Sequence, residues 1–435
     1  MNAIFILSDK SAITRTDRSI QGTFILHGAA ILVPDFADQD VRFSAAFSLI
    51  RNAIEQHTFP GTSLAVAVKS KLLALKSFGT FVYREDPEGA PSNLSLGGDF
   101  DFAVTPSMLF DLASLTKPVA TTTMAMMLYE RGLLELDAPI VGTIPEFRTN
   151  GSDSRRGDVT LRMLLAHSSG LPAYEKLFLR AHSRDKLLQA AFTTPLTADP
   201  GTRAEYSDIG FIILGEALER IAGETLDIFC RREIFGPLGM ANTSFNPPTA
   251  IRAKIPPTAD EREAQYGAGA PARESQTPAN EPGVTPKLPR SAFRQRIIQG
   301  EVQDENAFVL GGVAGHAGLF STAEELAIFA QTLLSGGTPI LRPETISLFT
   351  RRESEPAGTS RALGWDTPSS PSQSGKYFGP RSYGHLGYTG TSLWIDPDRQ
   401  LSITLLTNRT WPDCSNQAVK QVRPLIHDAI LEAIL

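Results

Sequence analysis

Two segments in the first part of the chain combine short apolar runs with polar turn residues. Residues 63–68 (SLAVAV) and 72–75 (LLAL) are apolar, and the polar tripeptide 69–71 (KSK) separates them. Apolar runs of this length, bounded by polar residues, are typical of paired β-strands. We therefore predict an antiparallel hairpin here, and a second hairpin over 393–406 with its turn at 396–399.

Helical spacing of apolar residues predicts a different structure for most of the remaining chain. We expect helices over 41–57, 119–131, 209–222, 323–334 and 416–435. Gly223 is expected to end the third of these, and Thr322 with Glu325 forms a capping box that opens the fourth. Strands near both chain ends with helices between them predict an α+β fold, in which helices flank one antiparallel sheet built from both ends.

This pattern also predicts a division into parts. We expect an N-terminal extension over 1–40, an α/β lobe formed by 41–120 together with 305–435, and a mainly helical lobe over 121–304. Residues 247–289 are rich in proline, glycine and polar residues and are expected to form a surface insert. The apolar stretch 23–33 resembles a signal sequence, but it contains His27 and no small-residue cleavage site follows. We expect a cytoplasmic protein, with export as the alternative.

Composition excludes several classes of function. The 435 residues are 42% hydrophobic and 20% charged, which is ordinary for a globular protein, and the net charge of −6 disfavours a nucleic-acid partner. No apolar run reaches the ~18 residues needed to span a membrane. Two cysteines and scattered histidines without metal-binding spacing predict neither a metal nor a cofactor. The oligomeric state stays open.

The strongest chemical signal is the sequence Ser114-Leu115-Thr116-Lys117 at the start of the apolar helix 119–131. Residues three apart on a helix face the same side, so Lys117 can activate Ser114 as a nucleophile. The helix start also offers backbone N–H groups for an oxyanion. A second Ser-x-x-Lys begins at Ser183, where a simple helix cap explains the serine. A helix cap is also the alternative role for Ser114. However, burying a lysine charge at the start of a buried helix costs free energy, which favours a functional role for Lys117.

Three further segments carry candidate site residues. Tyr206 lies in a loop before the helix 209–222, and a tyrosine can act as a general base where a lysine cation lowers its pKa from about 10. The alternative is that Tyr206 only packs while Ser207 or Asp208 caps the helix. The segment 384–392 and the segment 311–318, which contains His316, are rich in glycine, which permits close approach of a ligand or marks a simple bend.

The order Ser-x-x-Lys, then Tyr-Ser-Asp, then His-Leu-Gly at 385–387 resembles the serine β-lactamase and penicillin-binding-protein superfamily. Class C β-lactamases, D-alanyl-D-alanine carboxypeptidases and family VIII carboxylesterases are most similar. The resemblance covers about residues 59–408 and includes the segments 110–114, 164–171 and 318–322. It implies the β-lactamase/transpeptidase-like fold.

The resemblance also implies roles for individual residues. Ser114 would be the acylated nucleophile, and Lys117 and Tyr206 would share the handling of its proton, with the first base left open. The backbone N–H groups of Ser114 and Tyr388 would form the oxyanion hole. The implied substrate-binding residues are Asp208, His385, Gly387 and His316.

Two of these positions depart from the superfamily pattern. Asp208 replaces the usual asparagine; a carboxylate cannot donate to a substrate amide, although it can hold Lys117. His385 replaces a permanent cation in many relatives with a side chain that is mostly neutral at pH 7. Both changes disfavour a penicillin carboxylate and leave ester cleavage open.

We therefore expect a serine hydrolase that forms an acyl-enzyme, most simply a carboxylesterase acting on small acyl esters. A D-alanyl-D-alanine carboxypeptidase, a β-lactamase or a related amidase is the enzymatic alternative. A non-catalytic penicillin-binding sensor is the alternative of another class. An α/β-hydrolase is excluded because no Gly-x-Ser-x-Gly sequence occurs.

Overall fold

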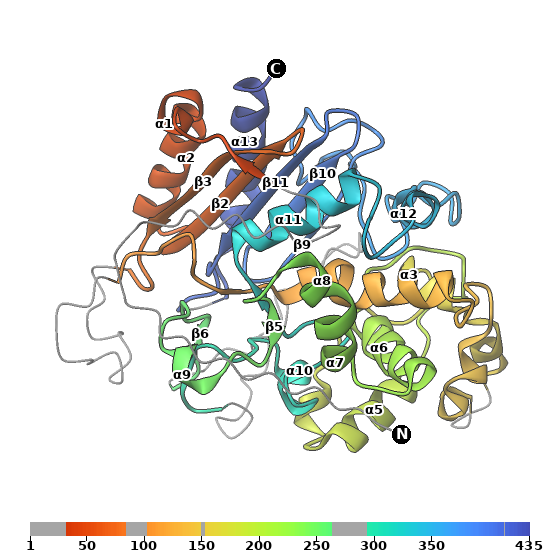
Figure 1. Ribbon diagram of the computed structural model, residues 1–435. Coiled ribbons are helices and arrows are strands. Elements are labelled where there is room, and N and C mark those ends of the chain that lie inside the picture. The colour runs from red at the N-terminus through yellow and green to blue at the C-terminus, as the bar shows by residue number, and fades with distance from the viewer. Residues whose placement is uncertain (1–31, 84–101, 149–152, 263–293, 413) are drawn as a thin grey trace, which may run out of the picture.

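The largest sheet has six strands that come from both ends of the chain (Figure 1). The computed structural model describes residues 32–83, 102–148, 153–262, 294–412 and 414–435. In spatial order the strands are β1 (Val33–Pro34), β3 (Lys71–Gly79), β2 (Gly61–Val68), β11 (Leu401–Thr407), β10 (Ser392–Asp396) and β9 (Tyr383–Leu386). All neighbours are antiparallel except β1, which pairs in parallel with β3.

Helices cover both faces of this sheet. Helices α2 (Ser44–Glu55) and α13 (Val419–Glu432) lie on one face, and α11 (Ala323–Leu334) lies on the other (Figure 1). Along β2, Leu64 and Val66 join the core beneath α2 and α13, whereas Ala65 and Ala67 join the core beneath α11. Alternate residues of a strand point to opposite faces, so a strand buried on both faces is apolar at nearly every position.

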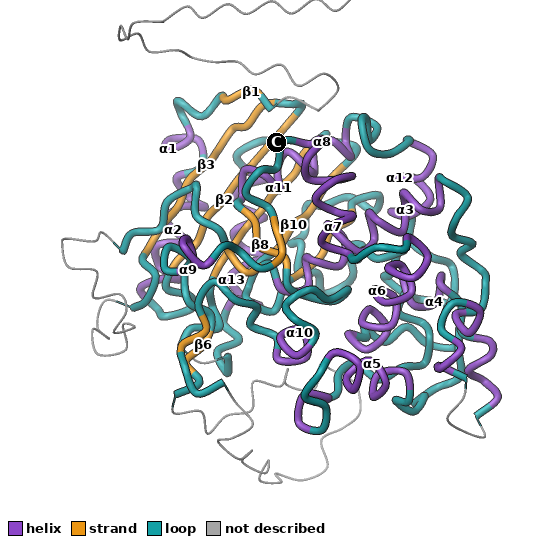
Figure 2. Tube along the Cα trace, turned by 60° about the horizontal axis from the view of Figure 1, so that its bottom comes forward, coloured by secondary structure: helices purple, strands orange, loops and turns teal. Residues whose placement is uncertain are grey.

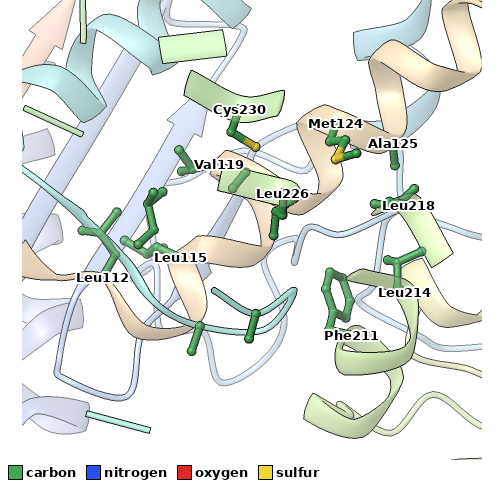
Figure 3. Packing of buried hydrophobic residues seen from close by; sticks show 14 of the residues in the cluster. Leu112, Leu115, Val119, Met124, Ala125, Phe211, Leu214, Leu218, Leu226 and Cys230 are labelled. Atoms are coloured by element: carbon green, nitrogen blue, oxygen red, sulfur yellow. The ribbon is translucent and has the colours of Figure 1, made fainter. Parts of the chain in front are cut away.

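Most of the remaining helices gather beside the sheet, whereas α1 lies next to α2 (Figures 1 and 2). Three of them form one apolar core: α3 (Thr123–Glu130), α6 (Asp208–Ala222) and α7 (Leu226–Cys230). In Figure 3, Met124 of α3 lies near Leu226 of α7, and Leu218 of α6 lies near Ala125 of α3. The shorter or peripheral helices are α1 (Gln39–Arg42), α4 (Leu161–Leu165), α5 (Arg184–Phe192), α8 (Gly236–Leu238), α9 (Thr249–Arg252), α10 (Glu305–Val309) and α12 (Pro343–Thr350).

A small sheet joins the helical region to the segment before Ser114. Its strands, in order, are β4 (Phe110–Asp111), β8 (Leu319–Ser321) and β5 (Ser244–Phe245). A separate pair consists of β6 (Ala259–Asp260) and β7 (Ile297–Ile298). Because β8 pairs with β4, the glycine-rich segment 311–318 enters the same region as Ser114.

The predicted fold class is confirmed: helices flank an antiparallel sheet that both chain ends build. Both predicted hairpins are present, as β2–β3 and β10–β11. Gly223 ends α6 with a left-handed φ of 73°, and the Thr322 side chain caps α11. The proposed division into lobes stays a prediction, and most of the extension 1–40 and of the insert 247–289 lies outside the described residues.

Two helices differ from their predictions. The segment expected to be one helix over 41–57 contains the end of α1 and all of α2, which Phe43 separates. The segment expected to be a single helix over 119–131 consists of a π-helical stretch, Lys117–Thr122, followed by α3. A 3-10 turn, Ala113–Leu115, precedes it. Across the described ranges, no helix combines the length and apolarity needed to cross a membrane.

Candidate active site

Ser114 lies in a sharp turn between β4 and the buried helical segment. The Asp111 carboxylate accepts hydrogen bonds from the backbone N–H groups of Ala113 at 2.8 Å and Gln303 at 2.7 Å. Ala113 has a φ of 47°, a left-handed conformation that costs energy for an L-residue with a side chain. Burial raises the pKa of Asp111 to about 6, although both N–H bonds oppose that shift. Asp111 thus holds the turn that presents Ser114.

Lys117 lies directly beneath Ser114 and is 0% exposed. Its Nζ donates to Ser114 Oγ at 3.0 Å, to Asp208 Oδ1 at 2.6 Å and to the carbonyl oxygen of His316 at 3.0 Å. An ammonium group has three donors, so these bonds use all of them. A buried lysine needs such partners, because an unpaired charge in the interior is strongly unfavourable.

The π-helical stretch and the glycine-rich segment 311–318 together build this lysine site. The Thr121 hydroxyl donates to the carbonyl oxygen of Gly315 at 2.7 Å, and this bond ties the two segments together. A Cβ at Gly315 would lie 2.2 Å from the carbonyl oxygen of Phe211 in α6, so only glycine fits. This close approach of the two backbones brings the His316 carbonyl oxygen to Lys117. Backbone packing therefore explains the glycine at position 315, and no ligand is needed to explain it.

Tyr206 completes the group around the serine. Its hydroxyl donates to Ser114 Oγ at 2.7 Å, and Lys117 Nζ lies 4.8 Å from the centroid of its ring. Tyr206 and Ser114 are 7% and 6% exposed, whereas Lys117 has no exposure. Proton transfer requires heavy atoms within about 2.6–3.2 Å, and both the Tyr206–Ser114 and Lys117–Ser114 distances meet this requirement. The arrangement can therefore take the proton of the Ser114 hydroxyl.

The phenol ring of Tyr206 has further neighbours. The His167 ring stacks on it with centroids 4.5 Å apart, and the guanidinium carbon of Arg361 lies 5.5 Å from its centroid. Arg361 also forms an ion pair with Asp366 at 3.5 Å, and both side chains are 21% exposed. Two cationic side chains, those of Lys117 and Arg361, therefore lie within about 6 Å of the phenol ring of Tyr206.

The segment between strands β9 and β10 lies against the turn that carries Ser114. The Thr389 hydroxyl donates to the carbonyl oxygen of Asp111 at 2.7 Å, and the Thr391 hydroxyl donates to that of Leu112 at 3.0 Å. A Cβ at Gly387 would lie 2.5 Å from the Leu112 carbonyl oxygen, so glycine permits this contact. Gly387 and Thr389, on either side of Tyr388, therefore contact the residues just before Ser114, while the Tyr388 ring packs 4.5 Å from the guanidinium carbon of Arg409.

The other residues expected to bind substrate, Asp208, His385 and His316, lie close to Lys117 or Tyr206. Asp208 begins α6 and bonds Lys117, which is the alternative role expected for a carboxylate at this position. His385 is 3% exposed, its Nδ1 lies 2.8 Å from the carbonyl oxygen of Leu386, and its ring centroid lies 5.9 Å from that of Tyr206. The His316 side chain is directed to Asp304, with Nε2 and Oδ1 2.8 Å apart, so His316 contacts Lys117 through its carbonyl oxygen.

Sequence reasoning missed two residues at this site. Arg361 lies in a loop with no recognisable motif, so only tertiary structure places it over Tyr206. His167 lies in the segment 164–171, which supports the resemblance to the superfamily but carries no motif that assigns a role to this histidine. The described residues contain no group of histidine, cysteine, aspartate or glutamate side chains able to hold a metal ion.

Comparison with known proteins identifies the family. A family model described as Beta-lactamase matches residues 46–423. The chain belongs to the beta-lactamase family. An Escherichia coli (strain K12) protein named as a D-alanyl-D-alanine carboxypeptidase is 34% identical over 322 residues, or 70% of each chain. The N-acetylmuramyl-L-alanine amidase of Bacillus subtilis (strain 168) is 31% identical over 375 residues, or 81% of this chain and 77% of the amidase.

Solved structures share the fold. EstCE1, a hydrolase with promiscuous acyltransferase activity, superimposes with a TM-score of 0.66 at 21% identity, covering 90% of this chain and 99% of its own. A class C beta lactamase from Rhodobacter sphaeroides superimposes with a TM-score of 0.61 at 21% identity. The match covers 90% of this chain and 100% of the beta lactamase. This beta-lactamase-family protein is a serine hydrolase, as predicted from its motifs.

Proposed function

We propose that this beta-lactamase-family hydrolase is a carboxylesterase that cleaves small acyl esters through an acyl-enzyme on Ser114. The observation that carries the proposal is the position of Ser114 Oγ, 2.7 Å from the Tyr206 hydroxyl and 3.0 Å from Lys117 Nζ. A serine hydroxyl becomes a useful nucleophile when a base lies within hydrogen-bond distance.

Tyr206 is the proposed base. The Asp208 carboxylate, 2.6 Å from Lys117 Nζ, stabilises the cationic form of that lysine. In acylation, Tyr206 as phenolate takes the Ser114 proton while Oγ bonds to the ester carbonyl carbon. The backbone N–H groups of Ser114 and Tyr388 bind the resulting oxyanion. The bond to the leaving alkoxide then breaks, and the alkoxide takes the proton from Tyr206.

Deacylation uses the same groups in reverse. Tyr206 takes a proton from water as the water oxygen bonds to the acyl carbon. The bond between the acyl carbon and Oγ breaks, and the proton on Tyr206 returns to Ser114. Lys117 stays charged throughout and stabilises each anionic form of the pair.

The preference for esters follows from the groups that surround this centre. Asp208 holds Lys117 and, as a carboxylate, does not donate to the side-chain amide of a β-lactam. His385 supplies no permanent cation for a β-lactam carboxylate. Loss of one charged hydrogen bond costs about 1.5–3 kcal/mol, or roughly one to two decades of rate. An activated ester requires neither contact.

A substrate panel tests the proposal. p-Nitrophenyl acetate and butyrate are expected to have a higher kcat/KM than penicillins or cephalosporins, and mass spectrometry is expected to find the acyl adduct on Ser114. Ser114→Ala should abolish turnover, while Ser183→Ala, in the other Ser-x-x-Lys sequence, serves as the matched control. Faster hydrolysis of a cephalosporin than of every ester would sink the esterase assignment, and an adduct on Ser183 would sink the choice of nucleophile.

The second candidate is cleavage of a peptide or amide whose leaving group carries a carboxylate. Two relatives support it, one named as a D-alanyl-D-alanine carboxypeptidase and one as an N-acetylmuramyl-L-alanine amidase. Arg361 also supports it, because its partly exposed guanidinium lies 5.5 Å from the ring centroid of Tyr206. D-Alanyl-D-alanine peptides therefore belong in the same panel.

A further inference from the structure

The loop of residues 167–173 is hydrogen-bonded to the segment that carries Tyr206. Backbone and side-chain hydrogen bonds connect the two on both sides of the tyrosine. These bonds run from Glu205 N to the His167 carbonyl oxygen at 2.8 Å, from Ser207 N to His167 Nδ1 at 3.0 Å, from Ser207 Oγ to the Pro172 carbonyl oxygen at 2.7 Å, and from Asp208 N to the Ala173 carbonyl oxygen at 2.8 Å. These bonds therefore fix the backbone on both sides of Tyr206.

The His167 side chain packs directly against Tyr206. Its ring stacks on the phenol ring with centroids 4.5 Å apart and an interplanar angle of 29°, and the centroid of the Phe211 ring lies 4.9 Å from that of His167. The residue is buried and has a left-handed φ of 57°, which costs energy for a histidine. A strained backbone persists where surrounding contacts determine it, and such residues cluster at functional sites.

The hydrogen bond to the Ser207 amide defines the protonation of this imidazole. A backbone N–H can only donate, so His167 Nδ1 must accept and carries no proton. The ring is consequently neutral, with its proton on Nε2. Protonation of Nδ1 would break the bond to Ser207 and place a cation on the face of Tyr206.

We propose that His167, as the neutral Nε2-protonated tautomer, is a positioning residue that holds the Tyr206 hydroxyl at Ser114. The Nδ1 bond fixes the main chain after the tyrosine, and the stacked ring fixes the plane of the phenol. Together they maintain the 2.7 Å distance between the Tyr206 hydroxyl and Ser114 Oγ. This role rests on the proposed function, because it acts only through Tyr206.

Two substitutions of His167 separate positioning from general packing. His167→Asn keeps an acceptor close to the position of Nδ1 and tolerates a left-handed φ, whereas His167→Gln moves the acceptor away. We expect His167→Gln to lower kcat for p-nitrophenyl butyrate by about 10²-fold, since a misplacement of about 1 Å can cost this much, with KM changed less than about threefold. His167→Asn should recover at least tenfold of this loss. Equal losses in the two variants would overturn the proposal.

A double-mutant cycle tests whether the effect passes through Tyr206. In a Tyr206→Phe background, His167→Gln should lower kcat less than about threefold further, because the group that it positions is already lost. A further 10²-fold loss would overturn the positioning role alone. Full activity in Tyr206→Phe by itself would instead overturn the proposed function.

A measurement on the wild-type protein keeps the proposal testable if the variants do not fold. Nitrogen-15 labelling of histidine allows NMR to report which ring nitrogen carries a proton. We expect His167 to show a protonated Nε2 and an unprotonated Nδ1 at about pH 7. A proton on Nδ1 of His167 would contradict the tautomer on which the proposal depends.

Discussion

Lys117 Nζ and Asp208 Oδ1 are 2.6 Å apart, and this ion pair lies beneath the hydroxyl of Ser114. The lysine side chain is 0% exposed and the aspartate side chain 12% exposed. The Asp208 carboxylate is therefore the counter-ion of the buried Lys117 cation. A neutral amide at the same position could accept the same bond but would leave the buried positive charge without a counter-ion.

The first prediction concerns the stability that this pair supports. Asp208→Ala leaves a buried ammonium without its anion, so we expect the free energy of unfolding to fall by about 3–5 kcal/mol. Asp208→Asn should lose less, because its amide oxygen still accepts from Lys117. Urea unfolding at neutral pH measures both. The control is Asp38→Ala, which removes an exposed ion pair with Arg42 and should cost at most about 1 kcal/mol. A similar small cost for Asp208→Ala would show that Lys117 needs no counter-ion.

The second prediction concerns the shared proton of Ser114. Tyr206→Phe and Lys117→Ala should each lower kcat by about 10²–10⁴-fold, the usual effect of losing acid–base assistance. Because Lys117 acts by stabilising the anionic forms of Ser114 and Tyr206, the two effects are coupled, and the double variant should lose far less than the product of the two effects. Steady-state kinetics with p-nitrophenyl butyrate provides the measurement. Multiplicative losses would mean that the two residues act independently.

The third prediction concerns Arg361 and the leaving group. Arg361→Gln should lower kcat/KM for an ester whose leaving group carries a carboxylate. The loss should be about tenfold larger than for the same ester with that carboxylate methylated, because an ion pair of about 1.4 kcal/mol corresponds to a tenfold change in rate. Suitable substrates are 4-acetoxybenzoate and methyl 4-acetoxybenzoate. Arg352→Gln is the matched control, because this arginine of the same loop donates to Thr367 Oγ1 at 2.7 Å. An equal effect of Arg361→Gln on both esters would exclude Arg361 from carboxylate recognition.

The fourth prediction concerns pH and Glu305, at the start of α10. Burial raises the pKa of Glu305 from 4.5 to about 8. Between these values the folded protein holds a proton that the unfolded chain releases, so this group makes stability fall as pH rises. Glu305→Gln should therefore lose less stability than the wild type between about pH 5 and about pH 8.

Urea unfolding at several pH values within this interval tests the Glu305 prediction. The same substitution at Glu55, which is exposed near the end of α2, provides the control and should leave the pH dependence as in the wild type. Parallel stability curves for the wild type and Glu305→Gln would contradict the assignment.

Local sequence determined much of the secondary structure. The two hairpins, the end of α6 at Gly223 and the Thr322 cap of α11 follow from residues adjacent in the chain, because strand alternation, glycine conformation and side-chain capping are local effects. The family and the chemical class likewise follow from short motifs. The division of one expected helix into a π-helical stretch and α3 did not follow from the local pattern.

Tertiary structure alone decided the environment of those motifs. Lys117 meets Asp208, 91 positions away, and the carbonyl oxygen of His316, 199 positions away. Hydrogen bonds between distant segments leave no periodic pattern in a sequence, and a carbonyl group belongs to every residue. For the same reason, neither the stacking of His167 on Tyr206 nor the guanidinium of Arg361 beside it could be predicted. The sequence by itself determined which groups can react, and the fold determined which groups hold them in place, because only the packed chain brings those segments within contact distance.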